Sequence, residues 1–212
     1  MKALDLNSEN KKTVLLIHPM LSSADGMKIN IADNLGDDLG YIIPDLSAHG
    51  ESIDKTYHSS KEEAHAIYDH LKALNISKLD LAYGASLGGV VLLQLLEYKD
   101  IQINKAIFEG CSLWQNSWIQ EFFMKKIFIK KHRKAIKDRE LAVKRMTRIY
   151  GEKASVMADT FIAMSEESII NIIHDCSFVN LPMLSEDEQR KCLFTYGSKE
   201  FDLRSAKKYL PK

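Results

Sequence analysis

The sequence has few of the features that would place it in a specialised class of protein. Its three cysteines, Cys111, Cys176 and Cys192, are far apart, so neither a CxxC zinc pattern nor a disulfide framework is indicated. The 29 basic and 29 acidic side chains give a formal net charge of zero, and no overall field favours nucleic acid. We therefore predict no metal site and no nucleic-acid partner.

Long hydrophobic runs are also missing. No stretch approaches the roughly 20 apolar residues of a membrane-spanning helix, and the N-terminal MKALDLNSENKK contains no apolar signal core. With unpaired cysteines, these absences predict a cytoplasmic protein. Apolar residues make up 45% of the 212, which is typical of a globular protein with one sizeable core.

What the sequence does contain is an alternation of short apolar runs and helical stretches. Strands are predicted from Thr13 (TVLLIHP), from Gly40 (GYIIPDL), over LDLAYG and over INKAIFEG. Helices are predicted over Ala24 to Leu39, after a capping box of Ser60 and Glu63, and over ASLGGVVLLQLLEY. This order predicts an α/β fold, with a parallel sheet covered by helices on both faces.

The pattern changes after residue 110. From 111 to 190 the sequence indicates helices and no clear strand, and KCLFTYG and LRSAKKYL then indicate one more strand and a short helix. We therefore predict that 1–110 form the first part of an α/β core. Residues 111–190 would be an all-helical insertion, and 191–212 would return to the core.

The strongest indication of chemistry is the stretch LAYGASLGG, Leu81 to Gly89. Ser86 lies between Gly84 and Gly88, where a predicted strand passes directly into a predicted helix. Such a turn lifts a hydroxyl above the carboxyl edge of the sheet and directs free helix N–H groups toward developing negative charge. We interpret Ser86 as a nucleophile; a serine that only caps the helix is the alternative.

Two further motifs accompany this one. His18-Pro19-Met20 follows the first predicted strand, and DLSAHGES, from Asp45, follows the second. Together with Gly84-Ala85-Ser86-Leu87-Gly88 they resemble the oxyanion turn, the D-x-x-G-H-G-x-S loop and the nucleophile elbow of the α/β-hydrolase superfamily. Proline replaces one glycine of that pattern, and Ala48 replaces another.

The resemblance is to the small capped esterase or lipase-like members, and it covers nearly the whole chain. It implies an α/β-hydrolase-type sheet, mainly parallel and flanked by helices, with the all-helical insertion as a cap over the active site. It also implies a serine hydrolase that cleaves a carboxylic ester or related small acyl substrate through an acyl-Ser86 intermediate, with no cofactor.

The same resemblance assigns individual roles. Ser86 would attack the acyl carbonyl, and the main-chain N–H groups of Met20 and Leu87 would form the oxyanion hole. His18 would orient its turn, or be a histidine satisfied at a strand end. His49 would support its loop.

The acid is expected in a G-x-x-D pattern after the strand that follows the cap. In YGSKEFDL that position is Glu200, with Asp202 as the second candidate, and Glu109 one strand earlier is the third. A solvated charged turn is the alternative interpretation. A carboxylate is needed there to hold the tautomer of a catalytic histidine.

The histidine itself is missing from its expected place. In this superfamily it follows the acid, yet no histidine follows His174. Three explanations remain open: the protein continues past Lys212, it is an inactive member, or another histidine such as His174 substitutes. The remaining candidates, predicted to be solvated, are His58, His65, His70 and His132. A non-catalytic binding or scaffold protein with the hydrolase fold is therefore the alternative function.

The predicted insertion is rich in aromatic and basic residues. Candidates to line a pocket under the cap are Trp114, Trp118, Phe122, Phe123, Phe161 and Met164. The stretch from Lys125 to Lys153 holds twelve Lys or Arg against three acids. A solvated helix face is the simpler interpretation, and contact with an anionic membrane surface is the alternative. The sequence does not indicate an oligomeric state.

Overall fold

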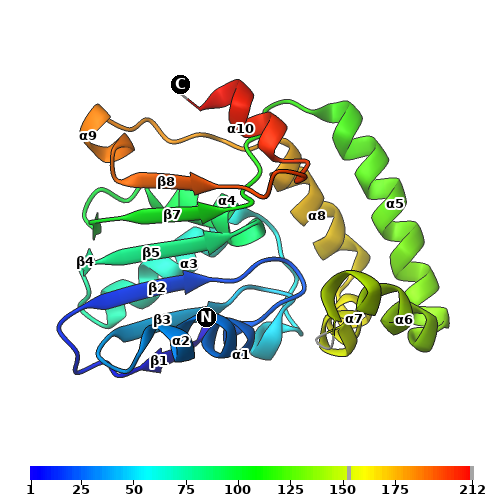
Figure 1. The fold of residues 1–212 in the computed structure, drawn as a ribbon, viewed down its shortest axis with the longest axis horizontal. Coiled ribbons are helices and arrows are strands. Elements are labelled where there is room, and N and C mark those ends of the chain that lie inside the picture. The colour runs from blue at the N-terminus through cyan, green and yellow to red at the C-terminus, as the bar shows by residue number, and fades with distance from the viewer. Residues whose placement is uncertain (152–153, 211–212) are drawn as a thin grey trace.

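The chain folds around one six-stranded sheet (Figure 1). The structure is a computed structural model in which residues 1–151 and 154–210 are described. The strand order is β1-β3-β2-β5-β7-β8; β1 runs antiparallel to β3, and the other pairs are parallel. The strands are β1 Lys2–Leu6, β2 Thr13–Ile17, β3 Gly40–Asp45, β5 Leu81–Ala85, β7 Ala106–Glu109 and β8 Cys192–Thr195. The prediction of a mainly parallel sheet is confirmed.

Among the strands that the sequence predicts, β2 and β3 are the most completely buried. All six residues of β3 are buried, because a parallel strand covered on both faces needs a continuous apolar run. Strand β1 was not predicted, since its sequence KALDL mixes charged and apolar residues at an edge of the sheet. A small second sheet pairs β4, Lys78–Leu79, with β6, Gln102–Ile103.

Helices cover both faces of the main sheet. On one face α3 (Ser60–Ala73), α4 (Leu87–Leu95) and α8 (Glu166–Ser177) share a buried cluster with the strands. Helix α4 is buried along its whole length, so its sequence carries no polar stripe. The opposite face is covered by a short helical segment, which comprises α1 Ala24–Met27, a π-helical turn Lys28–Ala32 and α2 Asp33–Leu35.

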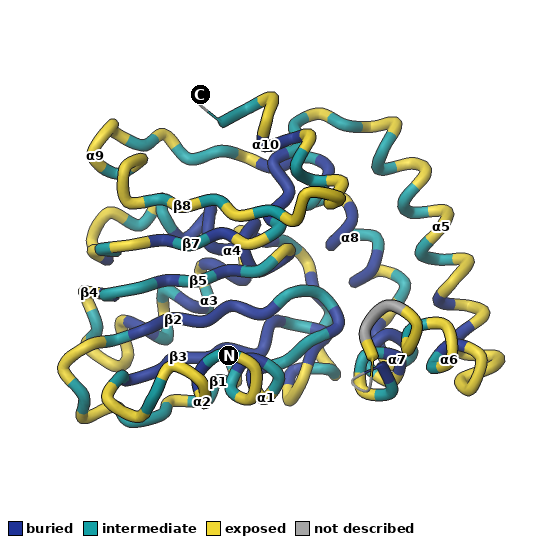
Figure 2. Tube along the Cα trace, viewed as in Figure 1, coloured by how far each residue is buried: buried dark blue, intermediate teal, exposed yellow. Residues whose placement is uncertain are grey.

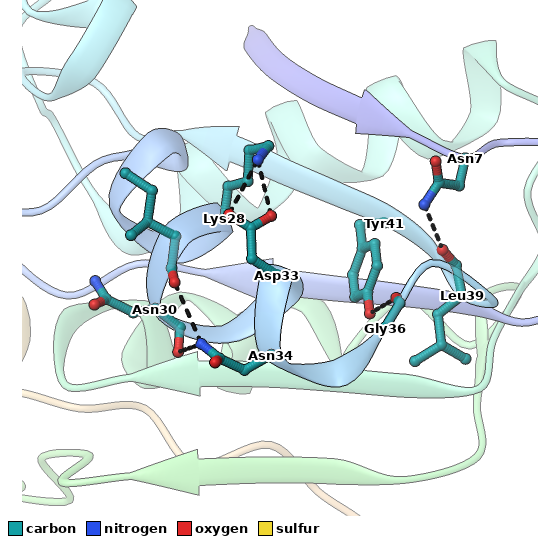
Figure 3. A network of polar contacts seen from close by, with 9 residues as sticks. Asn7, Lys28, Asn30, Asp33, Asn34, Gly36, Leu39 and Tyr41 are labelled. Atoms are coloured by element: carbon teal, nitrogen blue, oxygen red, sulfur yellow. Dashed lines mark hydrogen bonds and ion pairs between the residues drawn. The ribbon is translucent and has the colours of Figure 1, made fainter.

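This segment after β2 is shorter than predicted. It ends at Gly36, whose φ is +108°, rather than at Leu39. Figure 3 shows the polar contacts that hold it: the Tyr41 hydroxyl donates to the Gly36 carbonyl at 2.8 Å, and Lys28 Nζ donates to the Asp33 carboxylate at 2.8 Å. Residues with a Cβ seldom adopt this φ, so a glycine ends the helical segment and lets the chain turn toward β3.

The predicted capping box of α3 is wrong by one residue. The N-cap is Ser59, whose hydroxyl accepts the Glu62 N–H at 3.2 Å, and Ser60 is already helical. The Glu63 carboxylate instead accepts the Ser47 N–H at 3.1 Å. It therefore ties α3 to the loop after β3 rather than closing its own helix.

Four long helices separate β7 from β8 (Figure 1). They are α5 Trp118–Lys137, α6 Arg139–Tyr150, α7 Ala154–Ala163 and α8. A short α9, Glu186–Gln189, precedes β8, and α10, Leu203–Tyr209, follows it. Among the described residues between 111 and 190 there is no strand, as expected. None of the helices in the described ranges is long and apolar enough to cross a bilayer.

The helical insertion is attached to the core through the segment before α3. The buried Tyr57 donates its hydroxyl to Asp175 at 2.7 Å and its main-chain N–H to Ser168 Oγ at 3.0 Å. Asn171 Nδ2 donates to the Tyr57 carbonyl at 3.0 Å. Figure 2 shows that α8 has buried residues along its length, whereas α5 and α6 are largely exposed. Helix α8 is thus the part of the insertion that joins the core.

Candidate active site

Ser86 lies in a strained turn between β5 and α4. Its φ of +48° and ψ of −110° belong to a region that L residues seldom adopt, and such strain concentrates at functional sites. Its N–H donates to the Glu109 carbonyl at 2.7 Å, and its own carbonyl accepts the Gly89 N–H at 3.0 Å. The side chain is exposed, and its hydroxyl hydrogen-bonds to no residue in the described part of the chain. The turn is fixed by its backbone and leaves the hydroxyl accessible.

Close packing around this turn explains the glycines. A Cβ on Gly84 would stand 2.5 Å from the Gly88 carbonyl oxygen, and one on Gly88 would stand 2.3 Å from the Ile17 carbonyl oxygen. A Cβ on Gly89 would stand 2.8 Å from Cys111 Cβ. The prediction that small residues are required around Ser86 is therefore confirmed, and helix α4 lies against the ends of both β2 and β5.

The turn after β2 is also strained. The Pro19 carbonyl accepts the Ser22 N–H at 3.1 Å, and Leu21, the third residue of the turn, has a φ of +70°. A type II turn requires a positive φ at that position, where glycine is the usual residue. In such a turn the N–H of Met20 is not used by the turn's own hydrogen bond. The N–H of Leu87, the first of α4, likewise has no acceptor within its helix.

His18 is a structural residue at this turn. Its Nδ1 donates to the Pro19 carbonyl at 2.9 Å, and its Nε2 accepts the Leu46 N–H at 3.0 Å. Burial lowers the pKa of His18 to about 4, so the imidazole is neutral at physiological pH. With both nitrogens occupied, His18 joins the turn after β2 to the loop after β3, as the sequence analysis expected.

The loop after β3 is organised by a carboxylate that the sequence analysis did not single out. The buried Asp45 accepts the Ala24 N–H at 2.7 Å with one oxygen and the Glu51 N–H at 3.0 Å with the other. Ala48 has a φ of +66°, which explains why the matching position of the resembled pattern is glycine. A Cβ on Gly50 would stand 2.0 Å from Asp45 Oδ1, so this second glycine leaves room for the carboxylate.

His49 packs against His18, with ring centroids 4.9 Å apart. Its Nδ1 donates to the Ser47 carbonyl at 2.9 Å, and its buried Nε2 has no partner among the described residues. Burial lowers the pKa of His49 to about 3, and the nearby His18 acts in the same direction. This imidazole is neutral and enclosed, in agreement with the expected supporting role.

The three candidate acids have different environments. Glu200 is exposed, and its carboxylate lies beside Gly110, where a Cβ would be 3.2 Å from Glu200 Oε2. Gly110 directly follows Glu109, whose carbonyl accepts the Ser86 N–H, so Glu200 lies at the same carboxyl edge of the sheet as Ser86. Asp202 is more enclosed: burial raises its pKa, and the nearby Ser112 and Trp114 act in the opposite direction.

The third candidate, Glu109, is already engaged. The Tyr83 hydroxyl donates to its carboxylate, which directs that carboxylate back along the face of the sheet. Burial, followed by this bond, raises the pKa of Tyr83 well above its usual value. The described residues contain no group of three or more His, Cys, Asp or Glu side chains that could hold a metal ion.

Known proteins resemble this chain in structure but not in sequence. No protein-family model matches the sequence, and no curated protein is similar to it. Among solved structures, a carboxylesterase from Nitrososphaera gargenis is similar over 98% of this chain and 80% of its own, with TM-score 0.70 and 17% identity. A thermophilic esterase from Thermogutta terrifontis is similar over 92% and 84%, with TM-score 0.66 and 14% identity. The epoxide hydrolase CorEH is similar over 92% and 77%, with TM-score 0.65 and 14% identity.

The chain has the α/β-hydrolase fold. At these identities the likeness establishes the fold, and the chemistry must be argued from the residues. In the α/β-hydrolase fold the carboxyl edge of the sheet carries the site, and here that edge presents Ser86, the turn after β2 and Glu200.

The other histidines of this hydrolase fold make no hydrogen bond to Ser86 in the described part of the chain. His174 Nδ1 bonds Glu121 at 2.7 Å and its ring stacks on Phe178, on the insertion. His132, which the sequence analysis placed at the surface, is instead buried and packs edge-on against Phe161. It lies on the inner side of α5, where a basic run in the sequence gives no hint of burial. His58 and His65 are exposed, and His70 bonds Asp5.

An apolar cavity of about 190 Å³ adjoins the turn after β2. It lies between that turn and the insertion of the hydrolase fold, and its lining includes Leu21, Phe128, Met146 and Phe161. Phe161 was among the residues predicted to line a pocket. Trp114, Trp118 and Phe123, also predicted, line a separate open groove of about 520 Å³ together with Phe201. Phe122 is exposed on the outer side of α5.

Proposed function

We propose that this protein is a serine hydrolase that cleaves a carboxylic ester or related small acyl substrate. The observation that carries the proposal is Ser86: an exposed hydroxyl on a strained backbone, held between glycines at the start of a buried helix. Strain of this kind costs of the order of 1–3 kcal/mol and persists where function requires it. A serine that only capped the helix would need no positive φ, and Ser86 makes no side-chain cap bond.

In the proposed reaction Ser86 Oγ attacks the acyl carbonyl and forms a tetrahedral intermediate. The oxyanion accepts hydrogen bonds from the main-chain N–H groups of Leu87 and Met20, each worth about 3 kcal/mol of transition-state stabilisation. The alcohol leaves with a proton, an acyl-Ser86 ester remains, and water then releases the acid. The apolar cavity beside Leu21 would receive the acyl group.

Glu200 is the acid that the surroundings favour. An acid that stabilises an imidazolium must be ionised and must reach the base. Glu200 is exposed at the same edge as Ser86, whereas Asp202 is more enclosed and Glu109 is held by Tyr83.

A second function is favoured by the bonding of the histidines. His18 and His49, which support the loops at this edge, are neutral and enclosed, and His174 is tied to Glu121. In the described part of the chain no imidazole bonds the Ser86 hydroxyl. A binding or scaffold protein that keeps the hydrolase fold without its chemistry would have this arrangement.

Labelling with a fluorophosphonate distinguishes the two functions. We expect one phosphonyl adduct on the wild-type protein, measured by intact mass, because an activated serine attacks phosphorus as it attacks a carbonyl carbon. The adduct should be absent from Ser86→Ala and unchanged in Ser77→Ala, which removes an exposed serine at the opposite end of the sheet. No adduct on the wild type, or an adduct that survives Ser86→Ala, would refute the serine-hydrolase proposal.

The acid assignment has its own test. We expect Glu200→Gln to slow the labelling of Ser86 by at least about 100-fold, because a neutral amide no longer stabilises the imidazolium. Asp202→Asn should slow it by less than about 10-fold. The reverse order of the two rates would identify Asp202 as the acid, and circular dichroism would establish that both variants are folded.

A further inference from the structure

Helix α5 has an unusually apolar outer face. The exposed large apolar side chains along it are Trp118, Ile119, Phe122, Phe123, Ile127 and Ile136. Trp118 keeps 68% of its surface exposed and Phe123 keeps 58%. Single exposed apolar residues are ordinary, but a contiguous group with three aromatic rings marks an interaction surface.

The same helix is strongly basic. It carries seven Lys or Arg and a single acid, Glu121. Lys125 pairs with Glu121 and Arg133 pairs with Glu166. The cations that make no ion pair with any described residue are Lys126, Lys130, Lys131, Lys134 and Lys137. An open groove of about 510 Å³ is lined by six of the basic residues together with Ile129 and Ile170, and by no acid.

The apolar and basic residues share one side of the helix. Phe122, Lys126 and Lys130 follow one another at helical spacing, and Lys126 Nζ lies 4.1 Å from the centroid of the Phe122 ring. The opposite side, with the buried His132 and Ala135, packs inward. In Figures 1 and 2, α5 forms the margin of the molecule farthest from the sheet. This face therefore points to solvent, with its rings in the first half and most of its cations in the second.

We propose that this outer face of α5 binds the surface of an anionic lipid bilayer. Aromatic and isoleucine side chains enter the headgroup region, and the lysine stems lie along it while their ammonium groups stay hydrated beside lipid phosphates and carboxylates. The unpaired positive charge of the face is complementary to an anionic leaflet.

The combination of residues distinguishes this occupant from others. A dry protein interface would bury five unpaired ammonium groups among the rings, which is costly without partners. A nucleic acid or another soluble polyanion would use the cations and leave the apolar residues exposed to water. A bilayer surface accommodates both sets, because it offers an apolar layer directly beneath an anionic one.

Co-flotation with vesicles tests the proposal. We expect the wild-type protein to float with vesicles of phosphatidylserine and phosphatidylcholine at low salt, less at physiological salt, and not with phosphatidylcholine alone. The triple variant Lys126→Glu, Lys130→Glu and Lys134→Glu should bind at least about 100-fold more weakly. The matched control changes Lys11, Lys61 and Lys105, also exposed, to glutamate and should bind as the wild type does, apart from a small general charge effect.

Insertion of the rings has a separate readout. The chain has two tryptophans, so Trp114→Phe leaves Trp118 as the reporter. Its emission should shift to shorter wavelength on anionic vesicles and remain unchanged with heparin, a soluble polyanion. The double variant Phe122→Ser with Phe123→Ser should weaken the part of the vesicle binding that remains at physiological salt. Thermal melts of the lysine and phenylalanine variants should match that of the wild type, and Ser86→Ala should bind vesicles normally.

Three results would overturn the proposal. One is failure of the wild type to bind anionic vesicles at low salt. Another is complete competition of heparin with the anionic vesicles, together with Trp118 emission that does not shift on the vesicles. That result would indicate a general surface for polyanions. The third is a dimer in solution that Phe122→Ser with Phe123→Ser dissociates, which would assign the face to a second copy of the chain.

Discussion

Acidification to about pH 5 should lower the free energy of unfolding by about 4 kcal/mol through two buried imidazoles. The pKa of His18 falls from 6.5 to about 4 and that of His49 from 6.5 to about 3, mainly through burial. Between these values and 6.5 the unfolded chain binds protons that the folded chain does not. Acid therefore favours unfolding over this interval, and stability rises with pH. At about 1.5 pH units below 6.5, each imidazole lowers the free energy of unfolding by about 2 kcal/mol.

Such a loss is a large fraction of the roughly 5–15 kcal/mol by which proteins of this kind are stable. The carboxyls of Glu63 and Asp202 act in the opposite direction, because burial raises their pKa and the folded state takes up their protons first. At about pH 5, carboxyls with an ordinary pKa are still mostly ionised. The two histidines then dominate the pH dependence.

Urea unfolding at several pH values measures this effect. In His49→Gln the fall in stability between neutral pH and about pH 5 should be smaller by about 2 kcal/mol, since one of the two imidazoles is gone. His58→Gln, which removes an exposed histidine, should retain the full fall. An unchanged pH dependence in His49→Gln would show that the enclosed pair does not control the acid limb.

The sequence predicted the central strands because their burial leaves a simple trace. Strands β2 and β3 are covered on both faces, so TVLLI and GYIIPD read as continuous apolar runs. Strand β1 leaves no such trace, because it lies at an edge of the sheet and none of its residues is fully buried. Periodicity detects burial, and an edge strand is held by main-chain pairing that any side chain permits.

The orientation of α5 could not be read from its sequence. Apolar residues occur around most of the helix, so no single stripe indicates the inner side. Contacts with α7 and α8 select the side that carries His132 and Ala135, which leaves Phe122 and Phe123 outside. The prediction that these two rings lie under the cap and the prediction that His132 is solvated were wrong for this one reason.

In the candidate active site, too, some residues could be predicted from local sequence and others could not. Ser86 was predicted from a short motif that can be read locally, although the close contacts that require Gly88 and Gly89 are made with Ile17 and Cys111, far along the chain. Asp45 begins the DLSAHGES motif, but the motif does not reveal its role, because one of the main-chain groups it binds belongs to Ala24, on another segment of the chain. The role of a residue that binds distant main-chain groups can be recognised only in the structure, where the fold brings those groups together.

Gly88→Ala should destabilise the protein by at least about 3 kcal/mol, although Gly88 is in a helix. Helix propensity alone predicts a gain of about 1 kcal/mol for this change. The added methyl, however, would stand 2.3 Å from the Ile17 carbonyl oxygen and 2.8 Å from that of His18, and both are backbone atoms that cannot rotate away. Helix α4 would have to move off β2, and the N–H groups at Ser86 would move with it.

Urea unfolding of Gly88→Ala beside Gly197→Ala decides the matter. In Gly197→Ala the nearest atom to the new methyl is Glu200 Oε1 at 3.3 Å, the end of a flexible side chain, so we expect a change of less than about 1 kcal/mol. If Gly88→Ala is as stable as the wild type, the close approach of α4 to β2 is wrong. If it is strongly destabilised while Gly197→Ala is not, the glycine after Ser86 is needed because the sheet and the helix meet there, whether or not the serine is active.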